Sequence, residues 1–568
     1  MAYLIKKKIR NRIYYYLVES ARVDGKPRIV SQKYLGTADK VAETLNNSQS
    51  IPVPEYSIVQ DFGAVLALYD IAQRLGICEI IERHTGKREQ GLPVSDSILL
   101  AAINRAVMPK SKNTFFSWFE RTVLSACFPK TNKTNLSSQG FWNNMCQLNQ
   151  DMIRSIEDDI TKIVVDRYKV STECMLFDNT NFFTYIDTDN EATLAQRGHS
   201  KEKRSDLKIV GLSLMVSPDH NIPLFHETYP GNKNDAKRFS EIIDKLKRRY
   251  MKISSGECNV TLVFDRGNNS EDNIDDILSA DVLPFHFVGG LKLNQCGNLL
   301  TIPKEEFTPL LGDSFKKTTA YRTTLRVYGR NFVVVMTYNP ELYKSQLRGV
   351  TNNIAKCTTQ LSDLKKSLNR WVSGEVKKGR KPSESGVSKR IATILSAEHM
   401  KDVFGYATTL DNGFVTLSFG LIQESLEKLK REVLGRSFLF TDHADWTNEQ
   451  IVCAYRSQYH VEEAFKRMKD TKYLSFRPIY HSTDSKIQVH AFYCVLAYLL
   501  TCLLNRELEG MGYKMSINSM LDSFQAVQRV TTVFLDKTTK KEQVVYSYSN
   551  LRDSARVYIE RYNLLRYL

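Results

Sequence analysis

The spacing of apolar positions divides the chain into regions with different periods. Between residues 55 and 170, apolar residues recur at helical spacing, as in FGAVLALYDIAQRLGI and DSILLAAINRAV. From residue 171 the pattern changes to short apolar runs separated by helical stretches. We therefore expect a helical domain over 51–170, either a helix-turn-helix DNA-binding unit or a bundle that packs its own core, followed by an α/β region.

The α/β region begins with CMLFD and continues with LKIVGLSLMVS and IPLFHETY, which read as three strands. A helix is expected from about Asp235 to Tyr250, then the strand VTLVFD, a helix after Ser270 and the strand LPFHFVGGL. This order predicts a mixed sheet covered by helices over 171–299.

Residues 1–50 read as a small β unit. The β-rich runs RIYYYLVES and PRIVSQKYL flank Asp24-Gly25, a pair typical of hairpin turns. Lys and Arg residues surround these runs, so the unit is a candidate DNA contact. A solvated sheet edge protected by Lys has the same pattern, and both interpretations remain open.

Residues 300–445 interrupt the α/β order and predict an α+β insertion. TTLRVYGRNFVVVMTY reads as a hairpin, and a heptad-like seam follows, formed by Leu347, Val350, Ile354, Cys357, Leu361, Leu364, Leu368 and Trp371. The seam ends at the basic stretch SGEVKKGRKPSESG. An intramolecular helical hairpin is favoured over an intermolecular coiled coil.

The last region, 446–568, begins with a helix start near Thr447 and continues as IVCAYRSQYHVEEAFKRMKD. The most apolar segment, Ile487 to Leu504, contains Gln488, His490 and Thr501 and lies at the lower edge of membrane-spanning length. We expect a buried helix there and no membrane association.

Composition adds a preference for a polyanionic partner. The chain has 79 Lys plus Arg against 63 Asp plus Glu, a formal net charge of +16 at pH 7. A basic surface gains affinity for nucleic acid by releasing counterions from phosphates. The ten cysteines stand singly, without CxxC pairs, so a zinc site or a disulfide framework is not expected in what reads as a cytoplasmic protein.

The candidate chemistry is carried by acids. Asp178 and Asp265 each end an apolar strand of the expected sheet, although a lone Asp after a strand is usually a turn former. Tyr455, Glu462 and Lys469 are spaced by seven residues and share one helix face, as they would on an ordinary amphipathic helix.

Together, the three carboxylates suit two hard cations such as Mg²⁺, with Mn²⁺ as a substitute. Two such ions can activate a hydroxyl and stabilise the leaving oxygen of an in-line displacement. Glu463 points about 100° away around the helix, so it is expected to face solvent or form an ion pair.

At these residues the chain resembles a known family. YRSQYHVEEAFKRMK is similar to the signature of the insertion-sequence-4 superfamily of DDE transposases, with Tyr455, Glu462 and Lys469 at matching positions and Gln458 where Arg is usual. LSFRPIYHSTDSKIQVHAFYCVLAYLL, LFDNTNFF, PLFHETYPGNKND and VFDRGNNS resemble the branch named for insertion sequence 1634.

The resemblance implies an RNase H-like catalytic core interrupted by an insertion between Asp265 and Glu462. It implies that Asp178, Asp265 and Glu462 bind the catalytic metal ions and that Tyr455 and Lys469 contact DNA phosphates. Gln458 lacks the charge and bidentate fork of Arg, so Arg456, Lys466 or Arg467 are candidates to supply the missing charge. The basic stretch with Lys201, Lys203 and Arg204 is a further candidate DNA contact, or an ordinary exposed turn.

The sequence therefore predicts a transposase that cuts the ends of its insertion sequence and joins the 3′-hydroxyls to target DNA. Double-stranded DNA is the expected partner, within a homodimer, in the nucleoid-associated cytoplasm of a prokaryote. The alternatives are an RNase H-like nuclease and a domesticated DNA-binding protein without activity.

Overall fold

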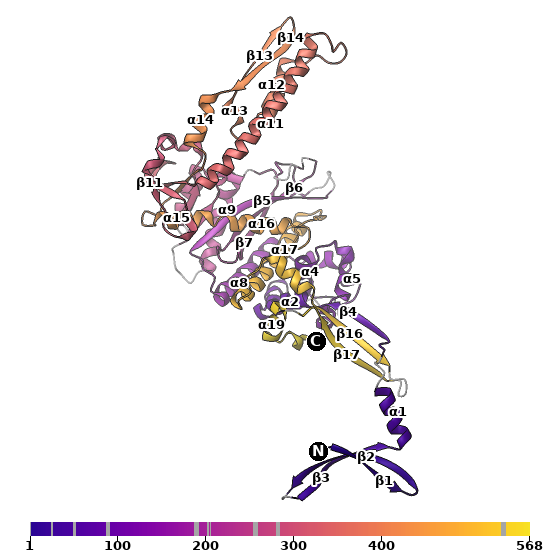
Figure 1. The fold of residues 1–568 in the computed structure, drawn as a ribbon. Helices are drawn as coiled ribbons and strands as arrows, with labels where there is room; N and C mark the ends of the chain where they lie inside the picture. Colours follow the sequence, from indigo (N-terminus) through magenta and orange to yellow (C-terminus); the bar gives the residue numbers. More distant parts are fainter. Residues whose placement is uncertain are drawn as a thin grey trace.

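The structure of the protein is a computed structural model. It describes the chain except residues 1, 24–25, 49–52, 87–90, 187–191, 201–203, 205, 234, 254–259, 280–284, 536–540 and 552. Figure 1 shows an elongated molecule with a small N-terminal sheet at one end and a long helical arm at the other. A helical block and a large sheet lie between them.

The N-terminal unit is a three-stranded antiparallel sheet followed by a helix. Its elements are β1 (Ala2–Ile9), β2 (Arg12–Val23), β3 (Lys26–Gly36) and α1 (Ala38–Ser48). The expected turn at Asp24-Gly25 lies outside the described residues. The ring of Tyr34 packs against those of Tyr14 and Tyr16, so the tyrosines form a small cluster on one face of the sheet.

The helical block combines two distant parts of the chain. Its N-terminal helices are α2 (Gly63–Leu75), α3 (Ile77–Thr85), α4 (Val94–Val107), α5 (Phe115–Glu120), α6 (Leu124–Cys127), α7 (Ser138–Met145) and α8 (Gln150–Tyr168). Its C-terminal helices are α17 (Asp484–Gly510), α18 (Ile517–Gln525) and α19 (Asp553–Arg561). A second three-stranded sheet joins the same two parts, because β4 (Tyr56–Asp61) pairs with β16 (Gln528–Leu535), which pairs with β17 (Glu542–Ser549).

Helix α17 is the central helix of this block and packs against α2, α4 and α8 and against the large sheet. Among the described residues it is the one helix long and apolar enough to cross a membrane. Because 94% of its most apolar window is buried inside the protein, its apolar surface is already covered. The buried helix expected over Ile487–Leu504 is therefore observed.

The large sheet has nine strands in the order β10-β11-β12-β15-β9-β8-β5-β6-β7. Their bounds are β5 (Cys174–Phe183), β6 (Ile209–Val216), β7 (Pro223–Pro230), β8 (Thr261–Phe264), β9 (His286–Gly290), β10 (Thr308–Pro309), β11 (Thr319–Val327), β12 (Arg330–Tyr338) and β15 (Arg436–Thr441). Among the described strands of this sheet, only the pairs β5–β8 and β8–β9 are parallel. The fold is a mixed α/β architecture consistent with an RNase H-like transposase core.

Four helices accompany this sheet: α9 (Asp235–Ile253), α10 (Glu271–Leu278), α15 (Asn448–Arg456) and α16 (Tyr459–Lys469). At the start of α15, Thr447 accepts a hydrogen bond from the Gln450 backbone and the Gln450 side chain accepts one from Thr447. This capping box lies where the helix start is predicted. Strands β11, β12 and β15, which the sequence places in the insertion, extend the central sheet.

The arm comprises residues 340–435. Its elements are α11 (Pro340–Val372), α12 (Glu384–Ile394), α13 (Met400–Val403), β13 (Phe404–Asp411), β14 (Phe414–Leu421) and α14 (Gln423–Glu432). The predicted seam packs within the chain: Leu361, Leu364 and Leu368 of α11 share a small core with Val387 and Ile391 of α12. This is the intramolecular arrangement favoured by the sequence, and it makes the arm a separately packed projection from the sheet (Figure 1).

Candidate active site

The two aspartates lie side by side at one end of adjacent parallel strands. Phe177 of β5 pairs with Phe264 of β8, so Asp178 and Asp265 follow at the same level. Residues at the same level of paired parallel strands present their side chains on the same face of the sheet, and the strands are about 4.8 Å apart. Asp178 is half-buried and Asp265 is exposed, so both carboxylates border solvent.

The backbone stabilises both aspartates locally. Asp178 accepts a hydrogen bond from the Asn179 backbone at 2.7 Å, and Asp265 accepts one from the Arg266 backbone at 2.8 Å. Asp265 caps the short 3-10 helix Arg266–Asn268 while keeping an extended conformation. The turn-former interpretation is thus correct for Asp265, and it leaves the carboxylate at the end of the strand.

Glu462 approaches the same place from α16, which packs on β5 and β6. It is exposed and lines an open cavity of about 550 Å³ together with Asp178, Thr180 and Lys469. A helix and a strand far apart in sequence therefore bring a glutamate and an aspartate to one cavity.

Tyr455 lies near enough to both Glu462 and Asp265 to be influenced by their charges. Burial, Asp265 and Glu462 together raise the pKa of the Tyr455 hydroxyl to about 12, while Arg266 lowers it. A cavity of about 490 Å³ is lined by Asp265 and Tyr455 on the core side and by α11 on the arm side. A Cβ on Gly290 would stand 2.5 Å from the Tyr455 hydroxyl, so this close approach requires glycine at position 290.

Gln458 is held inside the protein by a backbone contact. Its side chain is buried, and its amide Nε2 donates a 2.8 Å hydrogen bond to the carbonyl oxygen of Phe177, directly before Asp178. The predicted single helix from Tyr455 to Lys469 is also broken at this point into α15 and α16. Ser457 donates its hydroxyl proton to the Ala454 carbonyl, a local bond that competes with regular helix continuation.

The basic residues on and near α16 form different contacts within the protein. Lys469 donates a 2.9 Å hydrogen bond to the Thr180 hydroxyl, and Lys466 is exposed beside the same cavity. Arg467 pairs with Glu463, which agrees with the ion pair expected for that glutamate. Arg456 donates to the Ser314 carbonyl and the Thr318 hydroxyl, so it is held away from the acids.

The basic stretch between β5 and β6 is described only in part. Lys201 and Lys203 lie outside the described residues. Arg204 is exposed and forms a bidentate ion pair with Asp206, which lowers the pKa of that carboxyl to about 2. Its guanidinium lies 5.4 Å from the centre of the Phe183 ring, at the end of β5.

A buried amide network beneath the aspartates was not predicted. Asn179 accepts a 2.6 Å hydrogen bond from Ser213 and donates a long one of 3.5 Å to Asn268. Asn273 in turn donates to the Asn268 backbone carbonyl at 2.6 Å. The signal was present in the sequence, since asparagines closely follow both aspartates, but only the tertiary contacts separate this role from turn formation.

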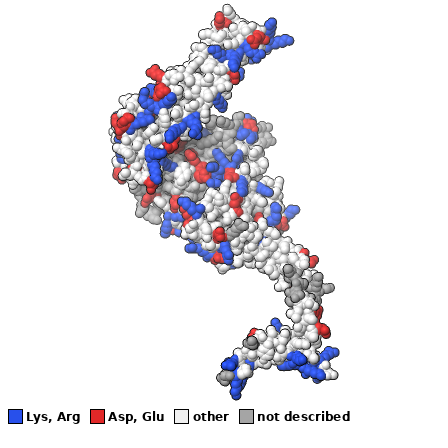
Figure 2. All heavy atoms as spheres, in the orientation of Figure 1, with Lys and Arg blue, Asp and Glu red and all other residues white. Residues whose placement is uncertain are grey.

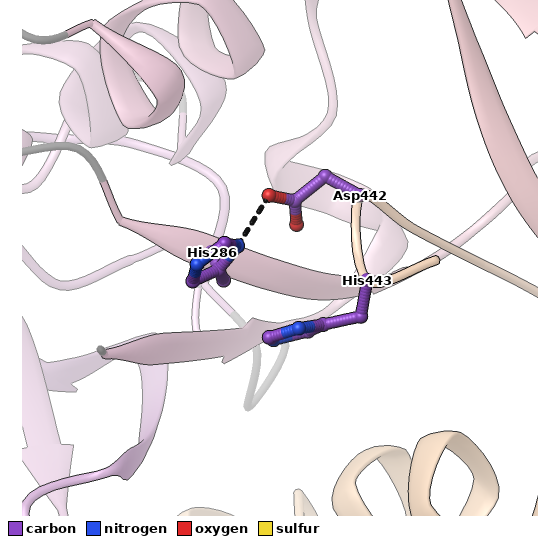
Figure 3. Close-up of side chains that lie close together, drawn as sticks. All are labelled: His286, Asp442 and His443. Carbon is purple, nitrogen blue, oxygen red and sulfur yellow. Dashed lines mark hydrogen bonds and ion pairs between the residues drawn. The ribbon is translucent and has the colours of Figure 1, made fainter. Parts of the chain in front are cut away.

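A second group of metal-ligating side chains lies at the other end of β8. His286, Asp442 and His443 offer ligand atoms within 4.8 Å of one another (Figure 3). Their donors already have partners: His286 and Asp442 form a 2.7 Å hydrogen bond, and His443 forms one of 2.7 Å with the Thr261 hydroxyl. The His443 ring stacks between those of His286 and Trp446. Because these side chains already form hydrogen bonds and ring contacts within the protein, we interpret this group as a structural contact between β8, β9 and the chain after β15.

Comparison with known proteins identifies the family of the chain. The family model described as "Transposase DDE domain" matches residues 183–500, more than half of the chain. This range contains Asp265 and Glu462 and begins shortly after Asp178. No curated protein matches the chain.

Among solved structures, the piggyBac transposase synaptic complex with hairpin DNA matches 81% of this chain and 78% of its own, with 9% identity and a TM-score of 0.37. That similarity is too distant to inform the site. The family match, by contrast, covers the central sheet apart from most of β5, together with the arm and the glutamate helix α16. The chain belongs to the DDE transposase family.

Proposed function

We propose that this transposase binds the ends of its own insertion sequence, cleaves the phosphodiester bonds there and transfers the 3′-hydroxyl ends into target DNA. The observation that supports this most directly is the approach of Asp178, Asp265 and Glu462 to one end of the central sheet. Asp178 and Asp265 are adjacent by strand register. Glu462 lines the same cavity as Asp178. Glu462 and Asp265 both raise the pKa of Tyr455.

DDE transposases depend on divalent metal ions, and the side chains at this site fit that requirement. Carboxylate oxygens on a solvent-accessible edge are ligands that Mg²⁺ prefers, and Mn²⁺ accepts the same donors. We propose that Asp178, Asp265 and Glu462 hold two such ions, with Mg²⁺ the natural one. Bound there, the ions would activate the attacking hydroxyl and stabilise the leaving oxygen.

The surrounding residues would orient the DNA phosphate. Tyrosine is protonated at neutral pH, and burial keeps the pKa of Tyr455 above its ordinary value, so its hydroxyl can donate a hydrogen bond. Lys469 and Lys466 border the cavity that contains Asp178 and Glu462, where their ammonium groups would attract phosphate oxygens. Arg204 and the undescribed Lys201 and Lys203 remain proposed backbone contacts.

The finer assignments follow the resemblance stated above. We place the chain in the insertion-sequence-4 superfamily and its insertion sequence 1634 branch, acting as a homodimer on element ends and target DNA in a prokaryotic nucleoid. The N-terminal sheet and the helical block are the proposed DNA-end-binding regions. Gln458 is assigned a positioning role in place of the phosphate contact.

The decisive experiment uses labelled duplexes that carry the terminal inverted repeats bordering the coding sequence, with Mg²⁺ and a target plasmid. Wild-type protein should release and join 3′ ends, whereas Asp178→Ala, Asp265→Ala and Glu462→Ala should bind the duplex without cleaving it. Lys428→Ala, an exposed position on the arm, is the matched control and should retain activity.

Cleavage without joining would replace the proposal with an RNase H-like nuclease. Cleavage that survives all three substitutions would refute the site assignment. Sequence-specific binding with no metal-dependent cleavage by the wild type would indicate a DNA-binding protein without activity.

A further inference from the structure

The far end of the arm carries a concentrated positive charge. Between residues 365 and 390 lie nine basic side chains and two acidic ones, Glu375 and Glu384. We call the basic residues the basic tip: Lys365, Lys366, Arg370, Lys377, Lys378, Arg380, Lys381, Lys389 and Arg390. All nine are exposed, and Figure 2 shows Lys and Arg gathered at this end of the molecule.

The charge is localised and does not continue along α11. The preceding stretch, residues 351–364, contains one Lys and one Asp and is therefore neutral overall. A helix that only faces solvent would have no physical reason to gather its basic residues at one end. The pattern instead indicates a contact at the end of the arm.

Few of these charges are neutralised within the protein. In the described part of the chain, Arg370 pairs with Glu375 at 3.4 Å, and the other tip residues have no carboxylate within ion-pair distance. The ammonium of Lys381 lies 3.6 Å from the centre of the Phe414 ring, which anchors the loop to the β13–β14 turn. The tip is thus an ordered cationic surface supported by the arm's own core.

The length of α11 separates the basic tip from the cavity that contains Asp265. Val350 and Asn353 of α11 line the cavity that contains Asp265. Arg370 lies twenty residues beyond Val350 on the same helix, which corresponds to about 30 Å at 1.5 Å per residue. The loop after α11 stays at the same height, since Gly379 lies against the ring of Trp371.

One helical turn of B-DNA is about 34–36 Å long, close to the reach of the arm. We propose that the basic tip binds the phosphate backbone of the substrate duplex about one helical turn from the phosphate held at the acids. This inference rests on the proposed function, because it requires DNA at the acid-lined site. The partner is a nucleic-acid backbone, which unpaired lysines and arginines recognise without reading sequence.

The test compares Lys377→Gln/Lys378→Gln with a matched double variant, Lys401→Gln/Lys428→Gln. The control removes two exposed arm lysines outside the tip. Binding is measured against salt concentration with end-containing duplexes of about 30 base pairs and of about 6 base pairs, the latter shorter than one turn. The tip variant should lower the slope of log K against log salt by about 1–2 on the long duplex only.

A second measurement locates the contact. Methylphosphonate linkages, which remove phosphate charge, should weaken wild-type binding when placed about one turn from the cleaved bond and not at half a turn. An unchanged slope for the tip variant, or equal weakening on both duplexes, would overturn the inference while leaving cleavage intact. A tip variant that alters self-association but not DNA affinity would also overturn it, in favour of an acidic protein surface. Absence of wild-type DNA binding would instead refute the proposed function.

Discussion

The two ends of strand β8 carry metal-ligating side chains in opposite states. At one end, Asp265 follows the strand beside Asp178 and its carboxylate is exposed. At the other end, Thr261 begins the strand and bonds to His443, which is buried between two rings. Four residues separate these positions, about 13 Å along a strand.

The difference lies in whether the potential ligand atoms already form hydrogen bonds within the protein. Asp442 accepts hydrogen bonds from the Phe287 backbone and from His286, so its oxygens serve the sheet. At the acid end, Asp178 and Glu462 line one solvent-accessible cavity and Asp265 lines another, and both Glu462 and Asp265 are exposed. From residue types alone, the histidine group would be the stronger candidate for a metal site. The hydrogen bonds and solvent exposure of the side chains instead favour the three acids.

The largest expected effect comes from one isosteric substitution at each end. Asp265→Asn should reduce cleavage by about a thousandfold or more, because a neutral amide is a poor ligand for Mg²⁺, and should leave the melting temperature unchanged or higher. Asp442→Asn should lower the melting temperature by several degrees and leave cleavage within about threefold. Single-turnover cleavage and calorimetry measure the two effects. Equal loss of activity in both variants would erase the distinction between the ends.

The histidine end should also respond to acid. Burial lowers the pKa of His443, and the neighbouring His286 lowers it further, while Asp442 and Asp445 raise it. The unfolded chain therefore takes up a proton first as pH falls below about 6.5, and stability is lost toward acid pH. The loss attributable to His443 should grow steadily from pH 6.5 toward pH 5.

Denaturant unfolding from pH 7 to pH 5 tests this sign. His443→Gln should show a shallower decline than the wild type. A shallower decline is the discriminating result because His490, which is fully buried and has a pKa well below its ordinary value, adds the same acid sensitivity to both proteins. Parallel curves would show that the protonation of His443 does not differ between the folded and unfolded states over this pH range.

A smaller effect is expected at the support of the acid end. Gln458→Met keeps a similar volume but removes the hydrogen bond to the Phe177 carbonyl, so Asp178 is less firmly positioned. Cleavage should fall about tenfold with a higher Mg²⁺ requirement and little change in DNA affinity. A loss of DNA affinity with an unchanged Mg²⁺ requirement would restore the phosphate-contact interpretation of Gln458.

The smallest effect should appear at the neighbour of the catalytic glutamate. Glu463 pairs with Arg467 and does not line the cavity that contains Asp178 and Glu462. Glu463→Gln should change cleavage by no more than about twofold and stability by about 0.5 kcal/mol, the usual scale of a partly exposed ion pair. The same assays applied to Glu462→Gln should show nearly complete loss of activity, and the reverse ranking would reassign the glutamate.

Several elements were predictable because they depend on local patterns. The strand–helix order of the catalytic region, the capped start at Thr447 and the internal packing of the Leu361–Leu368 seam all follow from hydrophobic spacing and capping chemistry. The break at Ser457–Gln458 was not predictable, since the heptad spacing of Tyr455, Glu462 and Lys469 is compatible with one continuous helix.

The sequence by itself determined which residues could do chemistry, namely two strand-end aspartates and a glutamate on an amphipathic helix. Only the tertiary structure decided which potential ligands remain open to solvent and which are committed to the fold. It buried Gln458, engaged His443 in a hydrogen bond with Thr261 and carried the basic tip to the far end of α11, about 30 Å along the helix from Val350. These outcomes depend on contacts between segments far apart in sequence, and local hydrophobic and charge patterns do not encode them.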